Sequence, residues 1–257
     1  MKTKSFLVLL ALLLGAFCFL PVAVRAQGQK AQLYYVYDFV VKPAMVSQFE
    51  AGVKREIELG SPTPWAAFST DDLHYYFLTP IQNYAGIDSM DKADNEWSAK
   101  VGKEKYDALM KRYEGTFEYL KGGVIRFLPE LSYAPKVPTP KPEEGNFMSW
   151  GFASVEFGKG KEFRDVMKQW VALYDSNKVP MGWNTFVGVM GVESPLFLWA
   201  ERAKSAAQYY ADDEKATKTI GEAKVAELWN KTMALCRKFE SKTGSARPDL
   251  SNKPKGK

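Results

Sequence analysis

The stretch GKEKYDALMKRYEGTFEYL at residues 102–120 returns as GEAKVAELWNKTMALCRKF at residues 221–239. The first copy ends in LPELS at Ser132 and the second ends in RPDLS at Ser251, so both ends of the copies are 119 residues apart. The two copies therefore match in length without a gap. Such a match indicates that one structural unit is built twice along this chain.

Apolar residues within each copy recur every three or four positions, a spacing that places them on one face of an α-helix. In the first copy they are Tyr106, Leu109, Met110, Tyr113, Phe117 and Leu120, and their counterparts are Val225, Leu228, Trp229, Thr232, Cys236 and Phe239. We therefore expect one packed helix in each unit. On this face Cys236 is expected to be a buried small residue and not a nucleophile.

The segments around the first copy complete a β-α-β-β-α-β order. Leu33–Val41 (LYYVYDFVV) is rich in aromatic and β-branched residues, which predicts a strand buried on both faces. The other predicted elements are a helix over 46–57, a hairpin over 65–79, a loop with a short helix over 81–100, and a last strand over 124–128.

The same order restarts after a proline-rich segment. Residues 134–146 (APKVPTPKPEEGN) predict a semi-extended linker. Beyond it, Phe163, Met167 and Val171 follow Phe49, Val53 and Ile57 by 114 residues, and the weakest match is the last strand, at 243–246. We expect a first unit over 27–133, a second over 147–251 and a basic tail over 252–257.

The N-terminus has the pattern of a secretory signal. Lys2 and Lys4 precede an apolar run that ends at Leu20, and Val24-Arg25-Ala26 predicts cleavage before Gln27. Loss of residues 1–26 lowers the formal net charge from +5 to +2, which gives no reason to expect a nucleic-acid partner. We expect an exported protein, periplasmic or extracellular, without a stable membrane anchor.

Two tandem units of this order resemble the dimeric α+β barrel superfamily, which includes antibiotic-biosynthesis-monooxygenase-like and NIPSNAP-like proteins. The resemblance implies an α+β fold in which two ferredoxin-like units pack face to face as a barrel within one chain, and hence a monomer. Its members include cofactor-free monooxygenases, haem-dependent enzymes, isomerases and proteins without known chemistry. The fold therefore does not choose the function.

Two polar residues in predicted strands are candidates for chemistry. His74, the sole histidine, is either a haem or metal ligand, as the resemblance implies, or a hairpin-edge residue capped by Asp71 or Asp72. Asp38 interrupts an apolar strand, and a buried carboxylate must find a partner or titrate with a raised pKa. It is a general base acting on a phenolic or enolic substrate, a structural ion-pair partner of a residue such as Arg126, or a strand-end residue that touches solvent.

The first strands of the two units differ in size on one face. At a separation of 114 residues, Tyr35, Tyr37 and Phe39 correspond to Ser149, Gly151 and Ala153. Either the large face interlocks with the small one, or the second unit keeps a cavity. The residues expected to contact a ligand are Tyr35, Tyr37, Tyr76, Ser149, Gly151, Ala153 and Trp199.

Three functions remain open on the sequence alone. The leading one is binding of a small apolar or aromatic molecule, with no cofactor expected. The second is a monooxygenase-like oxidoreductase or isomerase, cofactor-free or haem-dependent, and the third is a structural module of the cell envelope. Polar groups converging on a closed cavity favour the enzyme, an apolar cavity favours the binder, and a filled interior favours the module.

Overall fold

The computed structural model describes residues 30–136 and 144–254. The predicted signal segment and the middle of the predicted linker lie outside these residues. The first unit contains β1 (Leu33–Val41), α1 (Val46–Glu58), β2 (Ala66–Thr70), β3 (His74–Ile81), α2 (Ala85–Val101), α3 (Lys103–Tyr113) and β4 (Phe117–Phe127). The second contains β5 (Phe147–Val155), α4 (Gly160–Ser176), β6 (Trp183–Met190), β7 (Leu196–Ala203), α5 (Ala206–Ile220), α6 (Glu222–Met233) and β8 (Cys236–Ala246).

The eight strands form one closed antiparallel barrel in the order β1-β3-β2-β8-β5-β7-β6-β4. Each unit supplies four adjacent strands, so the predicted pseudo-dimer within one chain is confirmed. Two seams join the units, one between β2 and β8 and the other between β4 and β6. At the first seam a Cβ on Gly244 would lie 2.1 Å from the Ser69 carbonyl oxygen, so only glycine permits this approach of the two backbones.

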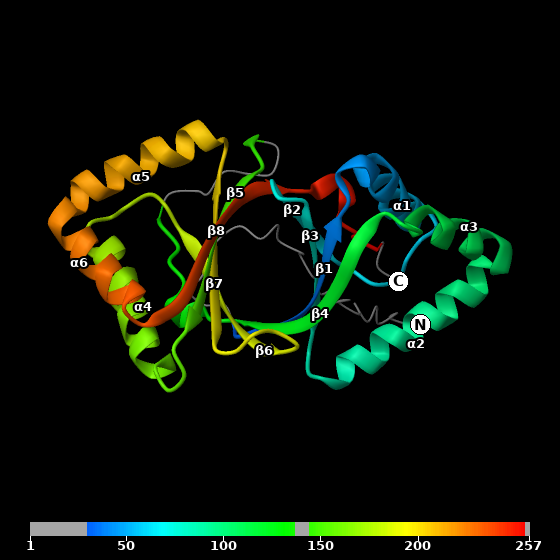
Figure 1. Cartoon of the computed structure of the whole chain (residues 1–257), viewed down its shortest axis with the longest axis horizontal. Helices are drawn as coiled ribbons and strands as arrows, with labels where there is room; N and C mark the ends of the chain where they lie inside the picture. The colour runs from blue at the N-terminus through cyan, green and yellow to red at the C-terminus, as the bar shows by residue number, and fades with distance from the viewer. Residues whose placement is uncertain (1–29, 137–143, 255–257) are drawn as a thin grey trace, which may run out of the picture.

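The helices cover the outside of the barrel in two groups. Helices α1–α3 lie on one side and α4–α6 on the other, as Figure 1 shows in a view through the ring of strands. Each half of the barrel therefore packs its outer face on its own helices and turns its inner face to the barrel interior. This arrangement explains why LYYVYDFVV lacks a polar face, although only Val41 is fully buried and the other residues of β1 are half-buried. None of the helices in the described ranges is long and apolar enough to cross a membrane.

The predicted helix through Leu120 is wrong in its second half. Helix α3 ends at Tyr113, Gly115 takes a left-handed φ of 71°, and β4 begins at Phe117. Phe117 still packs on the core beside α1, whereas Leu120 is 43% exposed. The spacing of three or four residues continued across the turn by coincidence. The second unit repeats the correction, because the half-buried Cys236 opens β8 and does not lie on a helix.

Residues 81–100 were predicted to be a loop with a short helix, but the helix is longer than predicted, because α2 has 17 residues, Ala85–Val101. Trp97 is the buried residue of this helix, and its indole nitrogen donates to the Leu59 carbonyl oxygen at 3.1 Å. A helix held through so few apolar contacts shows little periodicity in its sequence. The last strand of the second unit is likewise longer than predicted, since β8 begins at Cys236.

Candidate functional site

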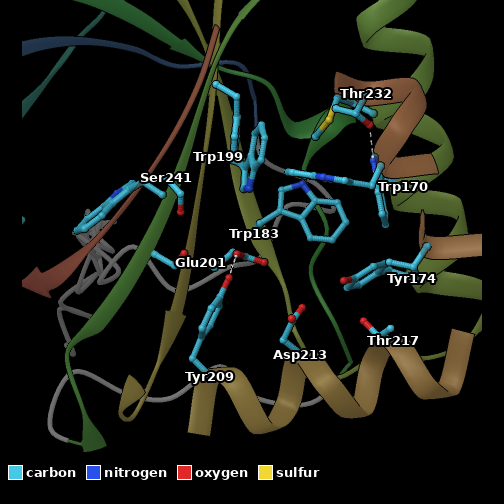
Figure 2. Close-up of a pocket in the computed structure, with 17 residues that line it drawn as sticks. Trp170, Tyr174, Trp183, Trp199, Glu201, Tyr209, Asp213, Thr217, Thr232 and Ser241 are labelled. Carbon is cyan, nitrogen blue, oxygen red and sulfur yellow. Dashed lines mark hydrogen bonds between the residues drawn. The ribbon is translucent and has the colours of Figure 1, made fainter. Parts of the chain in front are cut away.

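A cavity of about 390 Å³ lies in the second unit, between the outer face of the sheet and helices α4–α6. Figure 2 shows it enclosed by aromatic side chains from both layers. The rings that line it are Trp150, Trp170, Tyr174, Trp183, Trp199, Tyr209, Trp229 and Phe239. This wall of rings is suited to a flat apolar molecule, because aromatic faces stack on one another with centroids about 4.5–7 Å apart.

The cavity exists because the second unit has small residues where the first has tyrosines. Tyr35 and Tyr37 pack edge to face at 4.8 Å on the outer face of the first half-sheet. Burial, and then Tyr35 and the nearby carboxylates of α2, raise the pKa of Tyr37 to about 12. Ser149 and Gly151 hold the matching positions in β5 and line the cavity instead.

Gly151 also sets the position of Trp199. A Cβ at residue 151 would lie 2.3 Å from two ring atoms of the Trp199 indole, so the indole lies directly over the glycine. On its other side Trp199 stacks on Phe239, with centroids 5.6 Å apart and planes at 18°. The small residue thus seats one ring of the cavity wall and leaves the remaining space open.

The polar groups of the cavity are concentrated at its α5 end. Glu201 points inward from β7 and accepts a hydrogen bond of 2.7 Å from the Tyr209 hydroxyl. Burial raises the pKa of Glu201 to about 7, and Asp213 adds to the rise. Burial also raises the pKa of Asp213 itself. A carboxyl group with a pKa near neutrality can accept or donate a proton at physiological pH.

The corresponding helix contact in the first unit has a different composition. In the second unit the Trp170 indole nitrogen donates to Thr232 Oγ1 at 2.9 Å and joins α4 to α6. The counterparts of these residues are Glu56 and Tyr113, whose hydroxyl donates to Glu56 Oε2 at 2.8 Å. Burial raises the pKa of Glu56 to about 7 as well. The first unit thus also contains a buried carboxyl group with a raised pKa, although tyrosines occupy the positions of Ser149 and Gly151 there.

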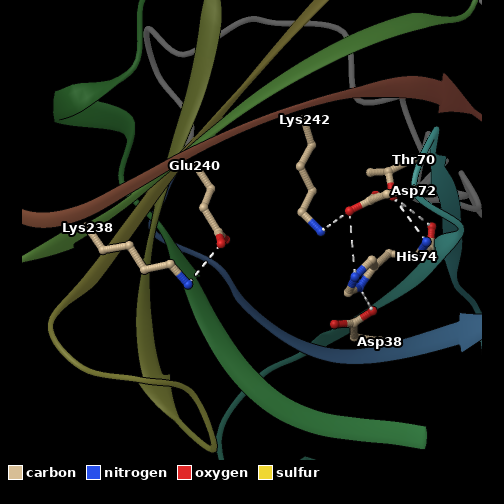
Figure 3. A network of polar contacts seen from close by, with 7 residues as sticks. All are labelled: Asp38, Thr70, Asp72, His74, Lys238, Glu240 and Lys242. Carbon is tan, nitrogen blue, oxygen red and sulfur yellow. Dashed lines mark hydrogen bonds and ion pairs between the residues drawn. The ribbon is translucent and has the colours of Figure 1, made fainter. Parts of the chain in front are cut away.

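Asp38 and His74 lie elsewhere, on the inner face of the barrel. His74 Nδ1 is 2.7 Å from Asp38 Oδ1, and His74 Nε2 is 3.8 Å from Asp72 Oδ2 (Figure 3). The partner of Asp38 is thus His74 and not Arg126, which the sequence offered as one example. Tyr76 stacks on His74 at 5.7 Å and belongs to the same interior surface.

The predicted ligand contacts are thus divided among three places. Ser149, Gly151 and Trp199 meet in the ring-lined cavity, and Ala153 is buried beneath it in the core beside Phe163. Tyr35 and Tyr37 pack outside the first half-sheet, and Tyr76 lies inside the barrel. The large face of β1 and the small face of β5 do not interlock, because each packs against the helices of its own unit, on opposite sides of the barrel.

Sequence reasoning missed Glu201, Tyr209 and Asp213. Glu201 interrupts the apolar strand LFLWAERA just as Asp38 interrupts LYYVYDFVV. Strand alternation also places Glu201 on the same face as Trp199. This signal in the sequence could have identified the carboxylate.

The donor set does not fit a histidine-held haem. The ring-lined cavity has neither histidine nor cysteine in its wall, and the sole histidine of the sequence lies in the barrel between two carboxylates. No group of three histidine, cysteine or acidic side chains that could hold a metal ion occurs in residues 30–136 and 144–254.

Comparison with known proteins finds similarity at the level of structure. No protein-family model and no curated protein sequence matches this chain. An anthrone oxidase-like protein matches with a TM-score of 0.60 and 12% identity, over 87% of this chain and 94% of its own. A proposed monooxygenase from Fusobacterium nucleatum matches with a TM-score of 0.54 and 13% identity, over 84% of this chain and 92% of its own.

A chlorite dismutase mutant from Candidatus Nitrospira defluvii matches with a TM-score of 0.51 and 10% identity, over 86% of this chain and 94% of its own. Identities this low establish the architecture and leave the chemistry open. The chain therefore has the dimeric α+β barrel fold of these proteins, with both halves of the barrel built from one polypeptide.

Proposed function

We propose that this protein binds a small planar aromatic molecule bearing a hydroxyl group, in the ring-lined cavity of its second unit. The observation that carries the proposal is the convergence of Glu201, Tyr209 and Asp213 on a space whose wall is largely aromatic. Its volume of about 390 Å³ lies within the range of roughly 300–1,000 Å³ that is usual for small-molecule sites. A filled interior, as expected of a purely structural module, does not describe this half.

Each part of the ligand has a matching part of the wall. A flat apolar body stacks between Trp199 and the rings of α4, where its surface is removed from water. Its hydroxyl donates to the Glu201 carboxylate, whose two oxygens can accept more hydrogen bonds than the one that Tyr209 donates. A ligand without the hydroxyl leaves this buried carboxylate without its second partner and binds less tightly.

Calorimetric titration with 2-naphthol and naphthalene tests the proposal. We expect saturable binding of 2-naphthol, weaker binding of naphthalene, and loss of both in Ser149→Tyr, which places in the second unit the side chain that the first carries as Tyr35. Ser89→Tyr, on the exposed face of α2, is the matched control and should bind like the unaltered protein. Undiminished binding to Ser149→Tyr would place the ligand outside this cavity.

A second candidate function is acid–base catalysis on the same ligand. It is favoured by the pKa of Glu201, near 7, because a carboxylate at that value removes a phenolic or enolic proton more readily than one near 4. The resulting enolate can take the proton back at carbon, as in an isomerase, or react with dioxygen, as in a cofactor-free oxygenase. Glu201→Gln should abolish turnover and retain binding of 2-naphthol, and unchanged turnover would exclude this role.

We also propose that the protein is exported and acts as a monomer in the periplasm or outside the cell. Support comes from the sequence of residues 1–26 and from a barrel that closes within one chain. Intact-mass measurement of exported protein should give a chain that begins at Gln27. A mass that still includes residues 1–20 would contradict it.

A further inference from the structure

The barrel interior contains a second cavity, separate in position from the ring-lined one. It has a volume of about 620 Å³ and is lined by the inward-facing residues of all eight strands. Strand alternation turns Val36 and Asp38 of β1 into this space, whereas Tyr35 and Tyr37 point toward the helices. The middle of the cavity is apolar, with Val36, Leu78, Phe152, Phe186 and Leu198 in its wall.

The charged residues at one end of this cavity are paired among themselves. Figure 3 shows the Asp38–His74 contact, the Lys242–Asp72 ion pair at 2.7 Å and the Lys238–Glu240 ion pair at 2.8 Å. Glu193 is paired with Arg237, and Lys121 Nζ lies 4.8 Å from the centroid of the Tyr119 ring. The remaining cation of the wall, Arg202, donates to the Gly145 carbonyl oxygen at 2.9 Å and to Asn146 Oδ1 at 3.0 Å. Since these charges already interact with groups of the chain, the cavity offers no strong site for an ionic ligand, and a neutral molecule fits it best.

The other end of the cavity contains a buried acceptor without a partner. Asn184 is 7% exposed and turns inward from β6, while its neighbour Trp183 lines the ring-lined cavity on the opposite face. Its Oδ1 atom forms no hydrogen bond with any part of the chain that the structure describes. An unsatisfied buried carbonyl oxygen is costly, so it favours a ligand that brings a donor.

We propose that the barrel interior binds a neutral, elongated apolar molecule with a terminal hydroxyl, such as a medium-chain alcohol. The hydroxyl donates to Asn184 Oδ1, the apolar chain lies along Leu198 and Phe152, and the paired charges surround its far end. This site needs no residue of the ring-lined cavity except Trp150, which belongs to both walls. Loss of binding at one site therefore does not imply loss of binding at the other.

The test is calorimetric titration of the full chain with octan-1-ol, di-n-butyl ether and octanoate. The ether has the same atomic composition as the alcohol without a donor, and octanoate has the same chain length with a charge. We expect saturable binding of one octanol per chain, with binding of the ether and of octanoate each weaker by about three- to tenfold or more, the factor typical of one hydrogen bond. Absence of saturable octanol binding, or equal affinity for alcohol and ether, would overturn the proposal.

Four variants locate the site. Leu198→Trp fills the apolar middle and should abolish octanol binding, and Ala200→Phe serves the same purpose if the first variant does not fold. Asn184→Leu should lower octanol affinity to the level of the ether and leave the ether unaffected. Ser149→Tyr, which fills the ring-lined cavity, should leave octanol affinity unchanged, and loss of octanol binding in this variant alone would assign the alcohol to the other cavity.

Discussion

Substituting Gly151 by alanine tests how the cavity is built. The added methyl group would lie 2.3 Å from Cε2 and Cζ2 of Trp199 and 2.9 Å from Cη2, so the indole must move. Its stacking on Phe239 opposes that movement. Overpacking of this kind costs about 1 to 3 kcal/mol, and for a chain of this size each kcal/mol lowers the melting temperature by roughly 2 to 4 °C. We expect Gly151→Ala to melt about 2 to 12 °C lower and to bind 2-naphthol more weakly.

A double-mutant cycle between residues 151 and 199 tests whether the clash with Trp199 causes the loss of stability. The atoms that clash include the outer ring of the indole, which phenylalanine lacks. Trp199→Phe should therefore relieve the clash, and the double variant should be more stable than the two single effects predict when added. Gly160→Ala is the matched control, because a Cβ at that position meets nothing within 4 Å. A Gly151→Ala variant that melts like the unaltered protein, or an absence of coupling between the two substitutions, would refute the clash with Trp199.

Further predictions concern the protonation of Glu201 and Glu56, the role of His74, and the stability of the two units when they are expressed separately. The folded-state pKa of Glu201 exceeds its unfolded value of about 4.5, so its carboxylate weakens the fold as pH rises through about 7. Glu201→Gln should therefore gain stability relative to the unaltered protein at pH 8 but not at pH 4, by at most about 3 kcal/mol; urea unfolding at both pH values measures this difference. Glu56→Gln should show the same pH effect in the same assay and leave 2-naphthol binding intact. Purified protein should lack a Soret band, and His74→Ala should leave the visible spectrum unchanged; a Soret band lost in this variant would restore the haem ligand. Residues 27–133 and 147–251 expressed separately should unfold or associate in size-exclusion chromatography, because each exposes two barrel edges, and stable monomers would contradict the intrachain barrel.

The fold could be predicted largely because the repeat is visible in the sequence. Equal spacing of the two copies indicated one unit built twice, and the aromatic run of β1 indicated a strand with two buried faces. The residues at which helices and strands begin and end were harder to predict. Phe117 keeps a helical spacing after Gly115 has ended the helix, and α2 contributes little apolar periodicity. The seams of the barrel involve residues far apart in sequence, such as Phe68 and Ala246, and no local pattern encodes them.

The candidate site was predictable in part. Ser149 and Gly151 stood out because the tyrosines of the first unit provide an internal comparison. Tyr35 and Tyr37 were also expected to contact the ligand, but they fill with their rings the part of the first unit that corresponds to the cavity. Glu201 carried a signal comparable to that of Asp38, a carboxylate within an apolar strand. Tyr209 and Asp213 lie on a polar helix, where nothing in the sequence separates them from solvent-facing residues.

The most direct test of the account is a structure of the protein with 2-naphthol. We predict the naphthol ring between Trp199 and the aromatic side chains of α4, with its hydroxyl within hydrogen-bond distance of a Glu201 carboxylate oxygen. The first unit should hold no ligand between its sheet and helices, where Tyr35 and Tyr37 lie. Naphthol found in the barrel interior or in the first unit, with the ring-lined cavity empty of it, would contradict the central claim.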